Sequence, residues 1–352
     1  MQINRITGDE CKTTKPLWEE VFYEDSDKFT NYYFENKADK NIGYVIGNYP
    51  YDAMMFRTPY CMQIGEEKRE ISYLVGVATR KEHRHKGYMR ALLTKSMEDM
   101  YQEKQPFTFL MPANPAIYTP FDFSYVYERD EWKIAIEEAC DEGRKKVREE
   151  KNNFMEDTKS IEGFHGIYAV SEMVEKVPQY PIYENLAKFA NAILRKKYQI
   201  YVHRDASYYE LQLKESLAQN GDIFVLFQEG VIKAFYLYGK EGEEVYIQEV
   251  LEEQEGSLRF LQKQDVKKTI IMARIIHAEE MMKLVRGKEE KEIVLQLEDA
   301  LIEANNGVFK WKLSPFGSSV ERLEGGVTAD GKITVRELTK HLLKDVFINE
   351  IV

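Results

Sequence analysis

The sequence contains little cysteine and no long apolar run, and both absences narrow what the protein can be. Its three cysteines, Cys11, Cys61 and Cys140, are odd in number and have no Cys-x-x-Cys spacing, which argues against a disulfide framework or a zinc knuckle. The longest apolar runs, such as residues 223–227, fall far short of the roughly 18 to 20 residues that a membrane-spanning helix needs. The first residues lack the basic patch, apolar stretch and small-residue cleavage site of a secretory signal. We therefore expect a cytoplasmic protein without a membrane partner.

An excess of positive charge is also missing. The chain has 49 lysines and arginines against 60 aspartates and glutamates, a formal net charge of -11 at pH 7. Nucleic acids and anionic lipids bind clustered lysines and arginines, so we expect no nucleic-acid partner. A cationic ligand is favoured instead, although an acidic surface also keeps soluble proteins apart.

Composition and length indicate several folded domains. The chain is 43% hydrophobic and 31% charged, which is typical of globular proteins, and its 352 residues exceed what one core usually supports. No repeat of 20 to 50 residues and no low-complexity tract occurs. A charged stretch suits a solvated connector, which gives domains at residues 1–136, 155–267 and 268–352 with a connector at 137–154.

Residue patterns predict the local elements of a mixed α+β fold. In the first domain we expect strands at 2–6, 41–47, 53–57, 72–79, 107–111 and 124–127, and helices around 17–22, 29–34, 87–100 and after Asn114, which caps a helix that opens with Pro115. Further on, the patterns predict a helix at 182–197 and a meander of strands at 223–228, 231–238 and 244–250. After these, the run 269–274 leads into a helix around 281–284, followed by strands at 293–297, 309–313 and 333–335 and a helix around 338–343.

The order strand, loop, helix between Val75 and Met100 predicts an anion site. A helix N-terminus presents unpaired N–H groups and a partial positive charge, and phosphates bind such ends. Arg84, Lys86 and Arg90 add positive charge there, while Gly87 lets a ligand approach the backbone closely. The pair His83-x-His85 lies in the same loop without a third ligand at useful spacing, so we expect no metal site.

Two motifs carry a resemblance to a known family. Residues 84–89 resemble the Gln/Arg-x-x-Gly-x-Gly/Ala pyrophosphate loop of the GNAT acetyltransferases, with Met89 where the family has a small residue. Residues 113–123 resemble the second signature, Asn-x-x-Ala-x-x-x-Tyr-x-x-x-Gly-Phe, with a shortened alanine spacing and Asp122 in place of glycine. The resemblance implies acetyl-coenzyme A as cosubstrate. It assigns to the cofactor site the strand backbone of Val77, Ala78 and Thr79, the loop residues Arg84, His85, Lys86, Gly87, Tyr88, Met89 and Arg90, and Asn114.

The same resemblance suggests a proton donor. In GNAT enzymes a tyrosine at the place of Tyr118 commonly protonates the leaving coenzyme A thiolate, and a phenol with a pKa of about 10 stays protonated at neutral pH. Phe123 stands where one subgroup has its tyrosine and cannot donate a proton. Either Tyr118 or Tyr125 serves instead, or the reaction depends on positioning alone, and we prefer Tyr118.

The entire chain resembles the enhanced intracellular survival (Eis) acetyltransferases. This resemblance implies tandem GNAT-like folds, of which residues 155–267 form the second and lack a coenzyme loop, and a small C-terminal domain like sterol carrier protein. It also implies a closed homo-oligomer such as a hexamer, and a general base formed by the terminal carboxylate of Val352. An α-carboxyl has a pKa of about 3.3 to 3.7, so it would act through a water or with its pKa raised by burial.

The resulting prediction is an N-acetyltransferase that moves an acetyl group from acetyl-coenzyme A to an amine by direct attack. The resemblance implies a cationic acceptor of the aminoglycoside or polyamine type. Two alternatives stay open, a protein-lysine acetyltransferase and a noncatalytic carrier that holds a hydrophobic ligand in its C-terminal domain.

Overall fold

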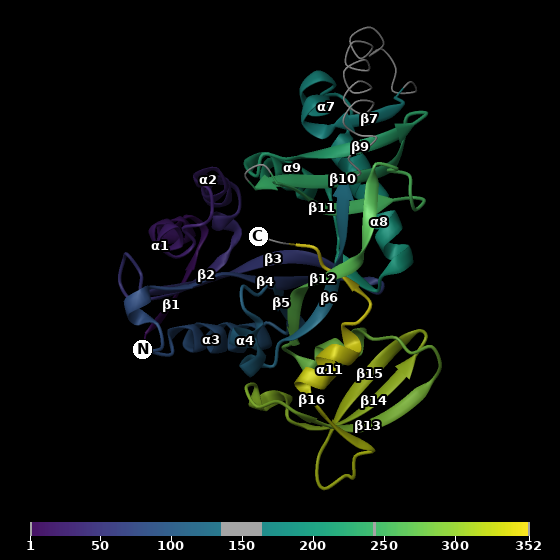
Figure 1. The fold of residues 1–352 in the computed structure, drawn as a ribbon. Coiled ribbons are helices and arrows are strands. Elements are labelled where there is room, and N and C mark those ends of the chain that lie inside the picture. Colours follow the sequence, from purple (N-terminus) through teal and green to yellow (C-terminus); the bar gives the residue numbers. More distant parts are fainter. Residues whose placement is uncertain (1, 135–163, 242–243, 351–352) are drawn as a thin grey trace.

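The computed structural model describes residues 2–134, 164–241 and 244–350, whose strands form three sheets (Figure 1). One sheet has nine strands and the other two have four each. The predicted mixed α+β class is confirmed. The predicted connector at 137–154 and the terminal residue Val352 lie outside the described residues. None of the helices in the described ranges has the length and apolar character needed to cross a membrane.

The N-terminal part of the chain builds most of the large sheet. Its elements are β1 (Ile3–Thr7), α1 (Lys15–Val21), α2 (Asp27–Asn36), β2 (Ile42–Ile46), β3 (Ala53–Ile64), β4 (Glu67–Thr79), α3 (Tyr88–Gln102), β5 (Phe107–Leu110), α4 (Pro115–Tyr118) and β6 (Ser124–Ile134). Strands β1 to β4 form an antiparallel meander, as the sequence predicts, with β3 and β4 longer than expected. In Figure 1, α1 and α2 lie on one side of this sheet and α3 on the other.

Local signals explain where these helices begin and which face they bury. The hydroxyl of Ser26 accepts a hydrogen bond from the Phe29 amide at 3.2 Å and caps α2. The apolar row of α3 is buried against the sheet, as its helical spacing predicts, through Leu92, Leu93, Met97 and Met100.

The middle part forms a second sheet, in the order β11-β10-β9-β7. Its elements are β7 (Gly166–Ala169), α7 (Val170–Lys176), α8 (Ile182–Lys197), β8 (Ile200–Val202), α9 (Ala206–Ala218), β9 (Asp222–Gln228), β10 (Val231–Glu241) and β11 (Glu244–Glu252). The predicted helix and meander are confirmed, whereas β7, β8, α7 and α9 were not predicted. The carboxylate of Asp205 caps α9 by accepting from the Tyr208 amide at 2.8 Å.

The last part contributes the third sheet, in the order β15-β14-β13-β16. Its elements are β12 (Leu261–Ile275), α10 (Ala278–Leu284), β13 (Lys291–Glu298), β14 (Gly307–Ser314), β15 (Gly317–Leu323), β16 (Gly331–Thr334), α11 (Val335–Leu342) and β17 (Val346–Phe347). Thr334 and Glu337 form a capping box at the start of α11. The likeness of this part to sterol carrier protein stays a prediction.

The predicted boundary at residue 268 needs a correction, because it falls inside the continuous strand β12. This strand pairs antiparallel with β5 and β6, so it completes the sheet of the N-terminal part. The sequence pattern changes there because residues 262–269 are mostly exposed while residues 270–275 are buried. A change of burial along one strand therefore looks like a change of domain, and the second sheet is built from residues inserted between two neighbouring strands of the first.

Candidate active site

Strand β4 bends at a bulge beside β3. Met54 pairs with Ala78 and Phe56 with Val75, so Gly76 and Val77 together oppose one residue of β3. Gly76 has φ +62°, and a Cβ at this position would lie 2.7 Å from Cζ3 of Trp18. Glycine is needed here both for its backbone conformation and for the close approach of the indole.

The bend separates β4 from β5. The two strands are parallel and pair only through Ser72 with Thr108 and Tyr73 with Phe109. Beyond Tyr73, β4 has β3 on one edge and no described strand on the other. The predicted cofactor-binding residues Val77, Ala78 and Thr79 lie in this segment. Its free edge offers backbone N–H and C=O groups to an extended ligand.

The loop after β4 ends at the N-terminus of α3. His85 has φ +62° and Gly87 φ +81°, and the loop side chains of residues 84–87 are exposed. No acidic residue lies in the first turn of α3, and no side chain caps its end. The first-turn amides of α3 have no partner within the helix, and together with the helix dipole they favour an anion.

The structure joins this loop to the strand edge and to the second motif. The Arg84 Nε donates to the Thr79 carbonyl at 3.2 Å, which ties the loop to the end of β4. On the first turn of α3, the Arg90 guanidinium lies 4.7 Å from the ring centroid of Phe121. These two contacts link the loop to the end of β4 and the first turn of α3 to the second motif.

The histidines of the loop have local partners. His83 Nε2 lies 3.3 Å from Asp52 Oδ1, and its ring stacks on Tyr88 with the centroids 5.7 Å apart. Within the described ranges of the chain, no group of three or more His, Cys, Asp or Glu side chains is placed to hold a metal ion.

The second motif forms α4 and the turn after it. Asn114 Oδ1 accepts a hydrogen bond from the Ala116 amide at 3.0 Å, which confirms the predicted helix cap. The cofactor-binding role of Asn114 stays a prediction. Tyr118 is buried, with its ring 5.9 Å from that of Phe123. Burial raises the pKa of Tyr118 to about 12, so the phenol is protonated at neutral pH. Tyr125 instead lies on β6, where it lines a pocket of about 400 Å³ between β6, β12 and α11.

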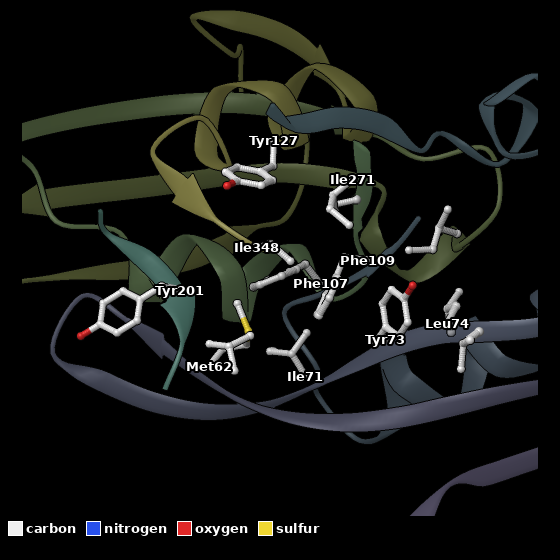
Figure 2. Packing of buried hydrophobic residues seen from close by; sticks show 14 of the residues in the cluster. Met62, Ile71, Tyr73, Leu74, Phe107, Phe109, Tyr127, Tyr201, Ile271 and Ile348 are labelled. Atoms are coloured by element: carbon white, nitrogen blue, oxygen red, sulfur yellow. The ribbon is translucent and has the colours of Figure 1, made fainter. Parts of the chain in front are cut away.

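Aromatic side chains that the sequence did not single out line the divergence of β4 and β5. The Tyr73 ring lies 5.2 Å from that of Phe109 and 6.1 Å from that of Tyr60 on β3. Figure 2 shows Phe107 and Ile348 in the same cluster of buried side chains. The pairing of Tyr73 with Phe109 across two strands decides this arrangement, so no local sequence signal could have found it.

The C-terminal segment enters the interior beside this cluster of buried side chains. Strand β17 pairs parallel with β8, Val346 with Ile200 and Phe347 with Tyr201, and β8 in turn pairs with β3. Ile348 is fully buried. Beyond it, Asn349 Nδ2 donates to the Gln248 carbonyl at 2.8 Å. The segment therefore lies between the large sheet and the middle part of the chain.

Known proteins resemble both the N-terminal sequence and the entire fold. Residues 2–126 match the family described as an acetyltransferase (GNAT) domain. A probable N-acyltransferase of unknown function from Enterococcus faecalis V583 has a TM-score of 0.72 at 15% identity, over 97% of this chain and 89% of its own. A GCN5-related N-acetyltransferase from Anabaena variabilis has a TM-score of 0.68 at 13% identity, and the match covers 96% of this chain and 89% of its own. Eis1 from Mycobacterium abscessus has a TM-score of 0.67 at 11% identity, and the match covers 97% of this chain and 90% of its own. A search of curated proteins finds no match.

These findings settle the type of domain and the fold. The family match confirms the predicted GNAT-type N-acetyltransferase domain in the N-terminal part. At no more than 15% identity, the likenesses to solved structures show the fold alone, and they extend it over the middle and C-terminal parts. The likeness to an Eis protein is confirmed at that level.

Proposed function

We propose that this protein transfers an acetyl group from acetyl-coenzyme A to a primary amine of a cationic small molecule, of the aminoglycoside or polyamine type. The observation that carries the proposal is the free edge of β4 leading, through a loop with two left-handed residues, to an uncapped helix end. The pantetheine arm of coenzyme A is extended and rich in amides, which suits a strand edge. Its pyrophosphate suits the helix end.

The residues of this surface fit such a ligand. No atom lies within 4 Å of the place where a Cβ of Gly87 would stand, so a phosphate has room at the backbone. Arg84, Lys86 and Arg90 are exposed around it and supply the positive charge. The backbone of Val77, Ala78 and Thr79 would hold the arm that carries the thioester.

Direct attack of the amine needs no nucleophile from the protein. The amine nitrogen bonds to the thioester carbonyl carbon, and the bond from that carbon to sulfur breaks. We assign to Tyr118 the proton that the leaving thiolate takes up, since its raised pKa keeps it protonated and Phe121, in the turn directly after its helix α4, contacts Arg90 on α3. The rest of the rate enhancement comes from holding the two substrates together.

The acceptor class is supported by the net charge of -11, which favours a cation over an anion. The role of the Val352 carboxylate as general base stays a prediction, because that residue lies outside the described part of the chain.

The test compares two glycine variants in a coenzyme A release assay with acetyl-coenzyme A and a panel of polyamines and aminoglycosides. Gly87→Glu should abolish coenzyme binding, measured by calorimetry, because a carboxylate at the helix end repels the pyrophosphate. Gly256→Glu is the matched control, since Gly256 has the same φ of +81° and equally open surroundings. Unchanged coenzyme A affinity in Gly87→Glu would refute the assignment of the loop.

The acceptor panel separates the alternatives. Release of coenzyme A with small amines supports the proposal, and release only with lysine peptides replaces it with protein acetylation. Thermal stabilisation by fatty ligands but not by acetyl-coenzyme A would favour a carrier.

A further inference from the structure

One buried carboxylate in the interior between the large sheet and the middle part forms no ion pair with any residue that the structure describes. Glu350 is only 3% exposed. Its Oε1 accepts a hydrogen bond from the Tyr208 hydroxyl at 3.1 Å, and its Oε2 is buried without any hydrogen bond to a described residue. An unpaired buried charge is costly, so a site of this kind is completed by a proton or by a cationic ligand.

The two buried cations of this region are already engaged. Arg204 holds both oxygens of Glu249, with Nη1 to Oε1 at 2.5 Å and Nη2 to Oε2 at 2.7 Å. Lys37 Nζ lies 2.6 Å from Glu215 Oε2. Each of these two cations is paired with another carboxylate, so among the described residues Glu350 has no cation of its own.

Glu350 also lies close to the divergence of β4 and β5. It follows Ile348 by two residues, a span of at most about 7 Å, and Ile348 belongs to the same buried cluster as Phe109 and Tyr73 (Figure 2). The ring of Tyr60 lies 6.0 Å from that of Phe109. Burial raises the pKa of Tyr60, and the negative charge of Glu350 raises it further. Tyr60 and Tyr208 are both partly exposed, and the Tyr208 hydroxyl donates to Glu350. An acceptor would have to approach the carboxylate past them.

Resting on the proposed N-acetyltransferase function, we infer that Glu350 receives the ammonium group of the acceptor and removes one proton from it. The proton moves from nitrogen to Oε2 and leaves a neutral amine with a free lone pair. That amine attacks the thioester carbon, the bond from carbon to sulfur breaks, and the leaving thiolate takes the proton of Tyr118. The second proton of the nitrogen restores the Tyr118 phenol, and Glu350 later returns its own proton to solvent. In this proposal Glu350, and not the carboxylate of Val352, is the general base of the reaction.

The surroundings of Glu350 suit this proton transfer. Burial raises its pKa to about 7, the charge of Glu249 adds to the rise, and Arg204 and the hydrogen bond from Tyr208 oppose it. A base with a pKa near the working pH is the most effective kind. The charged and titratable groups that face it are Arg204, Tyr208 and Tyr209 before and on α9, Glu249 on β11, Tyr60 on β3 and Tyr127 on β6.

The kinetic test uses Glu350→Gln, which keeps the shape and the acceptor for Tyr208. We expect kcat/KM for spermidine to fall by about 10² to 10⁴ at pH 7.5 and the inflection near pH 7 in its pH profile to disappear. Tyr208→Phe should keep the inflection but move it to higher pH, because the hydrogen bond that lowers the pKa of Glu350 is lost. A purely structural role would leave the position of the inflection unchanged in both variants.

A binding test separates this inference from the proposed function. Spermidine at pH 8 should raise the melting temperature of the wild type and should not raise that of Glu350→Gln. If the wild type acetylates no amine but shows this difference, the proposed function fails and the ammonium site stands. If the wild type acetylates spermidine while Glu350→Gln keeps both the pH profile and the melting shift, the role of Glu350 is overturned and the function stands.

Discussion

Replacement of Glu350 by glutamine should stabilise the protein in a pH-dependent way, even without any substrate. The folded state raises the pKa of this carboxyl from 4.5 to about 7, chiefly because the group is buried. The folded protein therefore binds this proton more tightly than the unfolded chain does. Stability is lost as the pH rises from 4.5 to about 7, and the loss is complete above that range.

The size of the effect follows from the shift. At 1.36 kcal/mol per pKa unit, the penalty reaches about 3 kcal/mol at pH 8, about 2 kcal/mol at pH 6 and close to zero at pH 4. Glutamine stays neutral and avoids this penalty. Glu350→Gln should thus unfold at a higher temperature than the wild type at pH 8, while the two should coincide near pH 4.

The assay is a series of thermal melts of the two proteins between pH 3 and pH 8. Glu337→Gln is a control of opposite sign, since hydrogen bonds from Thr334 lower the pKa of Glu337 in the folded state. That variant should lose stability relative to the wild type as the pH rises through the folded pKa of Glu337, below 4.5. A constant difference between Glu350→Gln and the wild type across the range would show that Glu350 is not a buried, unpaired carboxyl.

Two further changes test the geometry and the chemistry of the site. Gly76→Ala should cost about 3 kcal/mol in urea unfolding, because its Cβ meets Trp18 at 2.7 Å in a left-handed conformation, whereas Gly65→Ala, with φ +56° and open space, should cost about 1 kcal/mol; equal costs would refute the tight bulge. Tyr118→Phe should lower kcat by about 10² or more and leave coenzyme A affinity, measured by calorimetry, unchanged. Full activity in that variant would move the proton donor elsewhere.

The elements that carry the proposed cofactor side of the site could be predicted because their signals are local. Gly87 and the cationic residues around it mark the loop, and the apolar spacing from Met89 to Met100 marks the helix that follows. Asn114 and Pro115 mark the start of α4 in the same way. Each signal involves residues within a few positions of one another, so the backbone they favour is the one they adopt.

The acceptor side could not be predicted, because it depends on contacts between distant parts of the chain. Tyr60, Tyr73 and Phe109 come together only through strand pairing. In the sequence, Glu350 is one acidic residue among 60. Its proposed role follows from its burial near Arg204, whose guanidinium is already paired with Glu249.

The sequence by itself determined most helices and strands of the N-terminal part, the cap at Asn114 and the loop proposed to bind an anion, since propensity, periodicity and capping act over a few residues. Only the tertiary structure decided that β12 joins β5 and β6 across more than a hundred residues, that the bulge at Gly76 opens the edge of β4, and that Glu350 is left without a cation. The physical reason is the same in all three cases. Strand partners, close approach and desolvation of a charge are properties of groups brought together in space, and no local stretch of sequence contains both members of the pair.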